Sequence, residues 1–239
     1  HTAAAGHALT PSEARRVLAH TLSAGNPDLS GMRRPISKVA RAAVASATRW
    51  SRPRIIERVT DPGDASVRYL FQAEDGAVFE AVRIPLHKAD AFSVCLSSQV
   101  GCAMRCAFCA TGRLSLTRNL LPHEMFGAFC AVRDEAPGRV TGAVFMGQGE
   151  PFHNYDHVLQ TAQILSHPCG GRVSNKGITI STVGLVPQIE RFTAERHKFR
   201  LVVSMTSALA DRRQSLLPVA AKWSLEALAD ALRAYHHAI

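Results

Sequence analysis

The chain has 239 residues, of which 46% are hydrophobic and 20% are charged, so it holds enough apolar material for a folded core and is not of the disordered, collagen or coiled-coil class. Lys and Arg outnumber Asp and Glu by 28 to 19, a formal net charge of +9 that favours a polyanionic partner. The sequence has no run of about 18 apolar residues and no charged segment followed by an apolar one, so we expect no membrane span, no signal peptide and a cytoplasmic location.

The N-terminal part of the chain is basic and helical in pattern. Residues 1–60 hold ten Lys or Arg against three acidic residues, a local charge of +7. Helical patterns cover residues 11–22 and 37–48, with Gly and Pro breaks between them. We expect residues 1–54 to form a small accessory domain; charge alone leaves open whether it binds nucleic acid or is a solvated surface.

Alternating apolar residues replace the helical pattern in residues 55–90. The runs 68–72 and 78–84 flank a turn at 74–76, which predicts a β-hairpin that leads into the main domain.

Beyond residue 90, short β-branched runs alternate with helical stretches, the pattern of repeated βα units around a parallel sheet. The sequence predicts four such units. Their strands lie near 93–97, 142–146, 177–181 and 199–204, and their helices near 122–133, 155–166, 188–193 and 224–236. Because a complete eight-unit barrel needs about 250 residues by itself, we expect an α/β fold with a partial barrel over residues 91–239 that is incomplete at its C-terminal end.

Three of the six cysteines are closely spaced in the loop that leaves the first of these strands. Cys102, Cys106 and Cys109 form the pattern C-x3-C-x2-C, which can hold three irons of a cubane cluster and leave the fourth iron open. The alternative is structural zinc, which needs a fourth ligand, and Cys95 is the candidate. Cys130 lies at helical spacing among apolar residues and is predicted to be in the core.

The segment after the second strand reads Met-Gly-Gln-Gly-Glu-Pro over residues 146–151. Its glycines allow a ligand to approach the backbone, and the carboxylate of Glu150 can pair with an ammonium group. Such turns are common, but this one follows a strand adjacent to the cysteine loop, which predicts a shared cofactor site at the strand ends.

The cysteine triplet resembles the signature of the radical S-adenosylmethionine superfamily, and further blocks resemble the RlmN and Cfr family of RNA adenosine methyltransferases. These blocks cover nearly the whole chain, in order: Cys95–Cys102, Phe108–Gly112, Arg118–Leu120, Gly149–Pro151 with Asn154, Thr179–Gly184 with Pro187, and Ser204 with Asp211 and Pro218.

The resemblance implies a role for individual residues. Cys102, Cys106 and Cys109 would bind a [4Fe-4S] cluster. Glu80 would be the general base, and Cys95 would resolve a covalent enzyme–RNA intermediate by forming a disulfide. The residues that would contact S-adenosylmethionine are Gly149, Glu150, Ser181 and Ser204.

The implied reaction is methylation of C2 of an adenosine in 23S rRNA, and possibly in tRNA, through a 5'-deoxyadenosyl radical and a methyl-cysteine. A flavodoxin or ferredoxin would supply electrons, residues 1–54 would bind the RNA, and the protein would be a monomer. Two alternatives stay open: methylation of adenosine C8, as in the Cfr branch, and an iron–sulfur RNA-binding module without methyl transfer.

The sequence departs from the family pattern at three points. The resemblance places the methyl-carrying cysteine, and an asparagine that contacts the cofactor, beyond Ile239, because we expect the sequence to hold about four of the six βα units of a radical S-adenosylmethionine barrel. Neither Cys130 nor Cys169 is a convincing substitute for that cysteine. Thr206 stands where the family usually has His, and the segment between Glu80 and Cys95 is two residues longer than the pattern.

Overall fold

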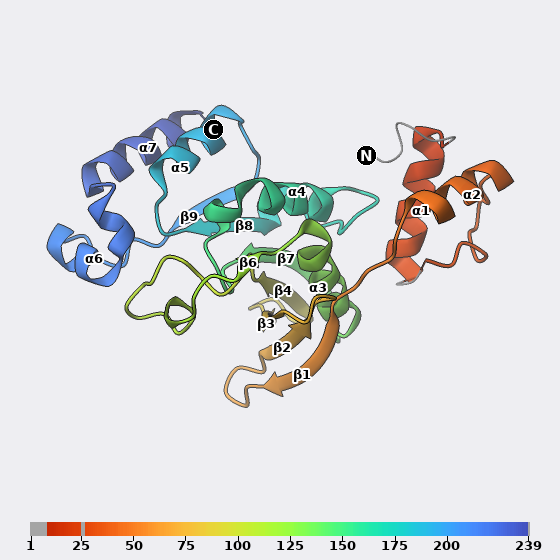
Figure 1. The fold of residues 1–239 in the computed structure, drawn as a ribbon, viewed down its shortest axis with the longest axis horizontal. Coiled ribbons are helices and arrows are strands. Elements are labelled where there is room, and N and C mark those ends of the chain that lie inside the picture. The colour runs from red at the N-terminus through yellow and green to blue at the C-terminus, as the bar shows by residue number, and fades with distance from the viewer. Residues whose placement is uncertain (1–8, 25–26, 239) are drawn as a thin grey trace.

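The computed structural model describes residues 9–24 and 27–238 and is built around one seven-stranded mixed sheet (Figure 1). Its strand order is β1-β2-β3-β4-β7-β8-β9. The strands are β1 (Arg54–Thr60), β2 (Val67–Gln72), β3 (Val78–Pro85), β4 (Ala91–Leu96), β7 (Arg139–Phe145), β8 (Ile178–Thr182) and β9 (Arg200–Val203). A second, two-stranded sheet pairs β5 (Gln99–Val100) with β6 (Arg118–Asn119).

Four of these strands are parallel neighbours, which confirms the predicted βα units. The strand β7 pairs with β4, β8 with β7 and β9 with β8. Their helices are α3 (Pro122–Asp134), α4 (Tyr155–Ser166), α5 (Val186–Ala194) and α7 (Leu225–Ala238), and a further short helix, α6 (Ala210–Leu216), precedes α7. The fold is an α/β partial barrel, as predicted.

The predicted hairpin, β2 and β3, belongs to the same sheet. The strand β3 runs antiparallel to β4, so the hairpin lengthens the barrel sheet. On its other side β2 pairs with β1, a strand that the sequence pattern does not predict because β1 is an edge strand, mostly exposed, with a bulge between Ile55 and Glu57.

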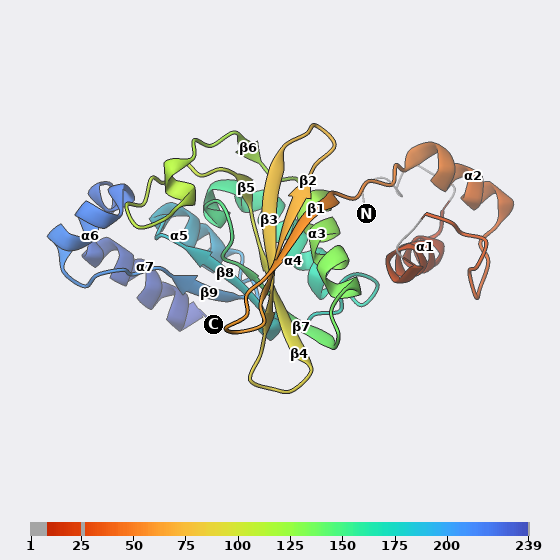
Figure 2. The same ribbon diagram turned by 90° about the horizontal axis from the view of Figure 1, so that it is seen from below.

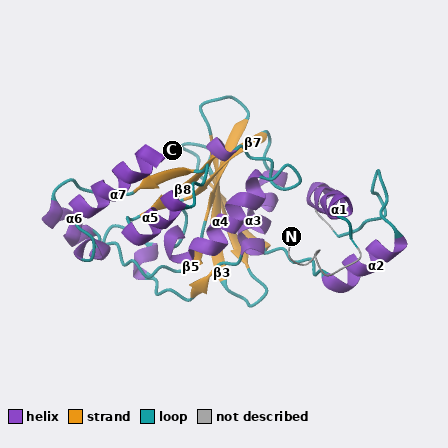
Figure 3. Cartoon of the chain, turned by 90° about the horizontal axis from the view of Figure 1, so that it is seen from above, coloured by secondary structure: helices purple, strands orange, loops and turns teal. Residues whose placement is uncertain are grey.

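The helices α1 (Pro11–Ala24) and α2 (Lys38–Ala47) confirm the predicted helical segments and stand apart from the sheet (Figure 3). They enclose a small apolar cluster of their own, made by Leu29, Met32, Ile36 and Ala40. Ser37 caps α2 by accepting a hydrogen bond from the amide of Ala40. The opposite end of the molecule is formed by α6 and α7 (Figure 2).

The main core lies between the sheet and its helices, and it contains Phe71, Phe79, Phe129 and Phe145, each at most 1% exposed. Cys130 is buried in this core, as predicted. The other face of the parallel strands is covered less completely. In β8, Ile178 and Ile180 point into the main core and are fully buried, whereas Thr179 and Ser181 point to the opposite face and are partly exposed. We call this opposite face the open face. The candidate site lies at the carboxyl ends of the parallel strands, next to this open face.

Among the described residues, no helix combines the length and the apolar character needed to span a bilayer.

Candidate functional site

The predicted site segments meet at the carboxyl ends of the parallel strands. After β4 and β7, the Gly147 amide donates to the carbonyl of Leu96 (3.0 Å) and the Ser98 amide donates to that of Gln148 (2.8 Å). After β8 and β9, the Ser204 amide donates to the carbonyl of Thr182 (2.9 Å). Parallel strands bring their carboxyl ends to one edge, which is the usual location of ligand sites in such sheets.

The cysteine loop follows β4 and β5, and its three thiols influence one another. Cys102 and Cys106 are buried, and Cys109 is half-buried. Burial, followed by the nearby thiols of Cys102 and Cys109, raises the pKa of Cys106 to about 11. Without a metal, the Cys106 thiol is therefore protonated at neutral pH, and its binding to a metal would release a proton.

The chemistry of this donor set fits an iron–sulfur cluster better than zinc. In the part of the chain that the structure describes, no three His, Cys, Asp or Glu side chains enclose a single metal ion. Cys95 lies in β4, where its thiol interacts with the backbone of Met146. A cubane cluster binds each cysteine to a different iron, so three neighbouring thiols without a fourth ligand leave one iron open.

Glu150 is a buried carboxylate that has no cationic partner among the described ion pairs. It is 2% exposed and accepts hydrogen bonds from the amides of Phe152 (3.0 Å) and Val183 (2.9 Å). Burial raises the pKa of Glu150 to about 7 in spite of these hydrogen bonds. A ligand ammonium group beside this carboxylate would restore its ionised form.

Gln99 fixes the backbone that carries Glu150, and the sequence gives no separate signal for it. It is fully buried, and its Oε1 accepts from the Glu150 amide (2.9 Å). Its Nε2 lies 2.7 Å from Oδ1 of Asn119 and 3.2 Å from Nδ1 of His153. Because Oε1 is the acceptor, Nε2 is the donor to both neighbours.

Gly149 packs directly against Gln99. Its φ is +97°, and a Cβ atom there would lie 2.6 Å from Cβ and 2.8 Å from N of Gln99. Only glycine fits both this conformation and this contact.

The two predicted serines lie close together on neighbouring strands. Oγ of Ser181, in β8, is 3.5 Å from Oγ of Ser204, which directly follows β9. Thr206 continues this segment with φ +62°, an uncommon conformation for a β-branched residue.

Glu80 and Cys95 lie on one face of the sheet, in the adjacent strands β3 and β4. Val82 is directly opposite Cys95, and Glu80, two residues earlier in β3, points to the same side, so the two are diagonal neighbours about 7–8 Å apart. Arg68 binds the Glu80 carboxylate (3.2 Å). Burial raises the pKa of the Cys95 thiol to about 11.

The disulfide implied for Cys95 is not found, since all six cysteines are free in the structure.

Arg213 is a buried charged residue that the sequence pattern does not single out, because it lies in the unpredicted helix α6. It is 2% exposed, its Nη2 donates to the carbonyl of Val183 (2.7 Å), and its Nε has no hydrogen-bond partner. Burial lowers the pKa of its guanidinium. Through Val183, Arg213 supports the same turn that donates to Glu150.

A partial α/β barrel with three cysteines in the loop after its first parallel strand defines an enzyme of the iron–sulfur, S-adenosylmethionine-binding class. Residues 96–238 match the Radical SAM superfamily, and the chain belongs to that superfamily. Membership implies a [4Fe-4S] cluster and S-adenosylmethionine as cofactors.

Similar proteins carry related names. The chain is 45% identical over 223 residues to a probable RNA methyltransferase of Anaeromyxobacter sp., covering 92% of this chain and 65% of that protein. It is 42% identical over 200 residues to the dual-specificity RNA methyltransferase RlmN of Syntrophotalea carbinolica, covering 84% of this chain and 53% of that one. The crystal structure of a radical SAM methyltransferase from Sphaerobacter thermophilus superposes with a TM-score of 0.85 and 33% identity, covering 99% of this chain and 69% of that chain. The chain thus spans about half to two thirds of the length of these curated relatives.

Proposed function

We propose that this chain carries the cofactor-binding part of an RNA methyltransferase that methylates C2 of an adenosine in 23S rRNA, and possibly in tRNA. The observation that carries the proposal is that Glu80 and Cys95 lie on the open face of the sheet whose strand ends hold the cysteine loop and Glu150. Its relatives named as RNA methyltransferases support an RNA substrate.

The cofactor residues have separate tasks in this proposal. Cys102, Cys106 and Cys109 hold the cluster. The buried Glu150 carboxyl group binds the amino group of S-adenosylmethionine, because it has no cationic partner among the described residues and an ammonium group would stabilise its ionised form.

Gly149 exposes backbone to this ligand, and the hydroxyls of Ser181 and Ser204 donate to its polar atoms. Together, the bound cluster and S-adenosylmethionine supply radical chemistry that protein side chains cannot perform.

Glu80 and Cys95 act on the RNA base. Arg68 orients the Glu80 carboxylate toward the open face, where it accepts the proton that leaves the base. Cys95 is a protonated thiol in the resting protein, and we assign it to the release of the base from the enzyme. The basic helices α1 and α2 bind RNA phosphates, and a flavodoxin or ferredoxin supplies electrons.

The cofactor assignment is tested by anaerobic reconstitution of the chain with iron and sulfide. We expect brown protein with about four irons per chain and reductive cleavage of S-adenosylmethionine to 5'-deoxyadenosine. Cys106→Ala should abolish both, whereas Cys169→Ala, a change in a distant loop, should leave both intact. Tight zinc binding without charge-transfer absorption would refute the cluster.

The substrate assignment is tested in cells. Mass spectrometry of 23S rRNA from cells with and without the gene should show loss of 2-methyladenosine. A change in 8-methyladenosine would instead place the protein in the Cfr branch. Iron uptake without any cleavage of S-adenosylmethionine would favour an iron–sulfur RNA-binding module.

A further inference from the structure

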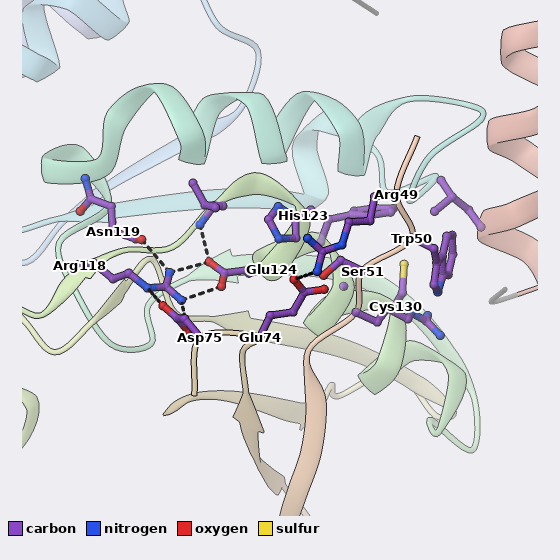
Figure 4. Close-up of a pocket in the computed structure, with 15 residues that line it drawn as sticks. Arg49, Trp50, Ser51, Glu74, Asp75, Arg118, Asn119, His123, Glu124 and Cys130 are labelled. Carbon is purple, nitrogen blue, oxygen red and sulfur yellow. Dashed lines mark hydrogen bonds and ion pairs between the residues drawn. The ribbon is translucent and has the colours of Figure 1, made fainter. Parts of the chain in front are cut away.

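A hollow of about 760 Å³ lies outside the cofactor site, where the segment that follows α2 crosses the start of α3 (Figure 4). This volume is within the roughly 300–1,000 Å³ of small-ligand sites. Its walls come from four parts of the chain: Leu22 of α1, residues 49–52, the β2–β3 turn at residues 74–75, and residues 118–130, which include β6 and α3. We call it the α3 hollow.

The cations in the α3 hollow are already paired with carboxylates. Arg118 binds both Asp75 (2.7 Å) and Glu124 (2.8 Å), as Figure 4 shows. Arg49 pairs with Glu74 at the rim. A phosphate group inside would meet three carboxylates and no unpaired Arg among these residues, so the charge pattern opposes an anion and favours a neutral group.

The apolar walls suit a flat aromatic group. Trp50 and Phe126 line the hollow, together with Leu121, which is 42% exposed. The guanidinium carbon of Arg52 lies 5.9 Å from the centre of the Trp50 ring. Stacking of a base on an aromatic side chain is worth about 1–3 kcal/mol and does not depend on sequence.

The α3 hollow lies between the basic helices and the cofactor edge. Since β3 runs antiparallel to β4, the β2–β3 turn is at the carboxyl end of β4, where the cysteine loop begins. Residues 118–119 pair with Gln99 and Val100, which follow that same strand. RNA held by the local charge of +7 in residues 1–60 would therefore lie next to this hollow.

We infer that the α3 hollow binds one unstacked base of the RNA substrate, with Trp50 as the stacking surface and the sugar–phosphate chain outside, past the exposed Arg49. This inference rests on the proposed RNA substrate. It adds a second base-binding position, distinct from the one at which methylation takes place.

The two tryptophans of the chain, Trp50 and Trp223, allow a direct test. In Trp223→Phe, Trp50 is the only tryptophan, and titration with a short fluorescein-labelled single-stranded RNA should quench its emission. In Trp50→Phe, the same titration should leave the emission of Trp223 unchanged. Anisotropy of the labelled RNA reports binding independently in every variant.

Affinity variants complete the test. Trp50→Ala should weaken RNA binding roughly 5- to 150-fold, the equivalent of the stacking energy, while Trp50→Phe keeps a ring and should bind within a few-fold of the wild type. Binding seen by anisotropy without quenching of Trp50 would overturn the base-binding hollow and leave the proposed function intact. Absence of RNA binding by the wild type would overturn both.

Discussion

Replacing Gly149 by Ala should damage the cofactor site through a collision with Gln99. The added Cβ would stand 2.6 Å from Cβ of Gln99, 2.7 Å from its Cγ and 2.8 Å from its backbone N. These atoms cannot swing away as the tip of a flexible side chain could, so Gln99 must move and lose its hydrogen bond to the Glu150 amide.

The magnitude follows from two terms. An alanine at positive φ costs about 1–2 kcal/mol, and overpacking of a filled site adds about 1–3 kcal/mol. Gly76→Ala is the matched control, because Gly76 has φ +85° but a Cβ there meets no atom within 4 Å. The two variants share the backbone term, so the difference between them isolates the collision.

Thermal unfolding and binding of S-adenosylmethionine to the reconstituted protein are the two measurements. Gly149→Ala should unfold roughly 2–12 °C below Gly76→Ala, given about 2–4 °C per kcal/mol for a chain of this size. It should also bind S-adenosylmethionine roughly 5- to 30-fold more weakly, while Gly76→Ala binds as the wild type does. Equal melting temperatures with unchanged binding would refute this account of Gly149.

Three further outcomes are expected. Burial alone would raise the pKa of Glu195, but hydrogen bonds from Tyr155, His197 and Arg191 lower it to about 2. The ionised Glu195 carboxylate therefore stabilises the fold above pH 4.5, and this stabilisation is lost as the pH falls toward 2. Because the Glu195 side chain is 36% exposed, solvent screening limits this stabilisation to on the order of 1 kcal/mol. The free energy of unfolding should therefore fall less steeply with decreasing pH in Glu195→Gln than in the wild type. An identical dependence on pH in the two proteins would contradict this role of Glu195. Arg213→Met should weaken binding of S-adenosylmethionine, measured by equilibrium dialysis, by about 1–2 kcal/mol, and Arg213→Lys should recover part of the loss. Wild-type affinity in both variants would show that Arg213 does not support the Val183 turn. Asn154→Ala should lower the melting temperature by several degrees, because the Asn154 amide donates to two buried carbonyls, at 2.8 Å each, and a scan that superposes on the wild type would disprove this.

The sequence pattern was most informative where strand and helix alternate. The parallel strands and their helices follow predicted positions within a few residues, because each strand is a short run that includes β-branched residues and is followed by a helical pattern. It was least informative for β1 and α6. Most of β1 is exposed and one bulge breaks its alternation, and α6 has only seven residues, too few for a helical period to stand out.

The sequence likewise reveals some residues of the candidate site and not others. The cysteine spacing and the Gly-Glu-Pro turn are visible in the sequence because their residues are adjacent in the chain. The roles of Gln99 and Arg213 are not visible in the sequence, because each acts through a contact with a distant segment. Gln99 accepts a hydrogen bond from Glu150, 51 positions later, and Arg213 donates one to Val183, 30 positions earlier. Such tertiary contacts have no local periodicity.

The antiparallel pairing of β3 with β4 has a consequence for how the proposed function could change. The superfamily match begins at Leu96, yet Glu80 and Cys95, the two side chains assigned to the RNA base, both precede it. In the proposed function, Glu80 therefore reaches the site only through the pairing of β3 with β4, whereas Cys95 lies in β4 itself, directly before the matched segment. Substitutions in β3 can alter what happens to the base while every residue assigned to the cofactor stays unchanged.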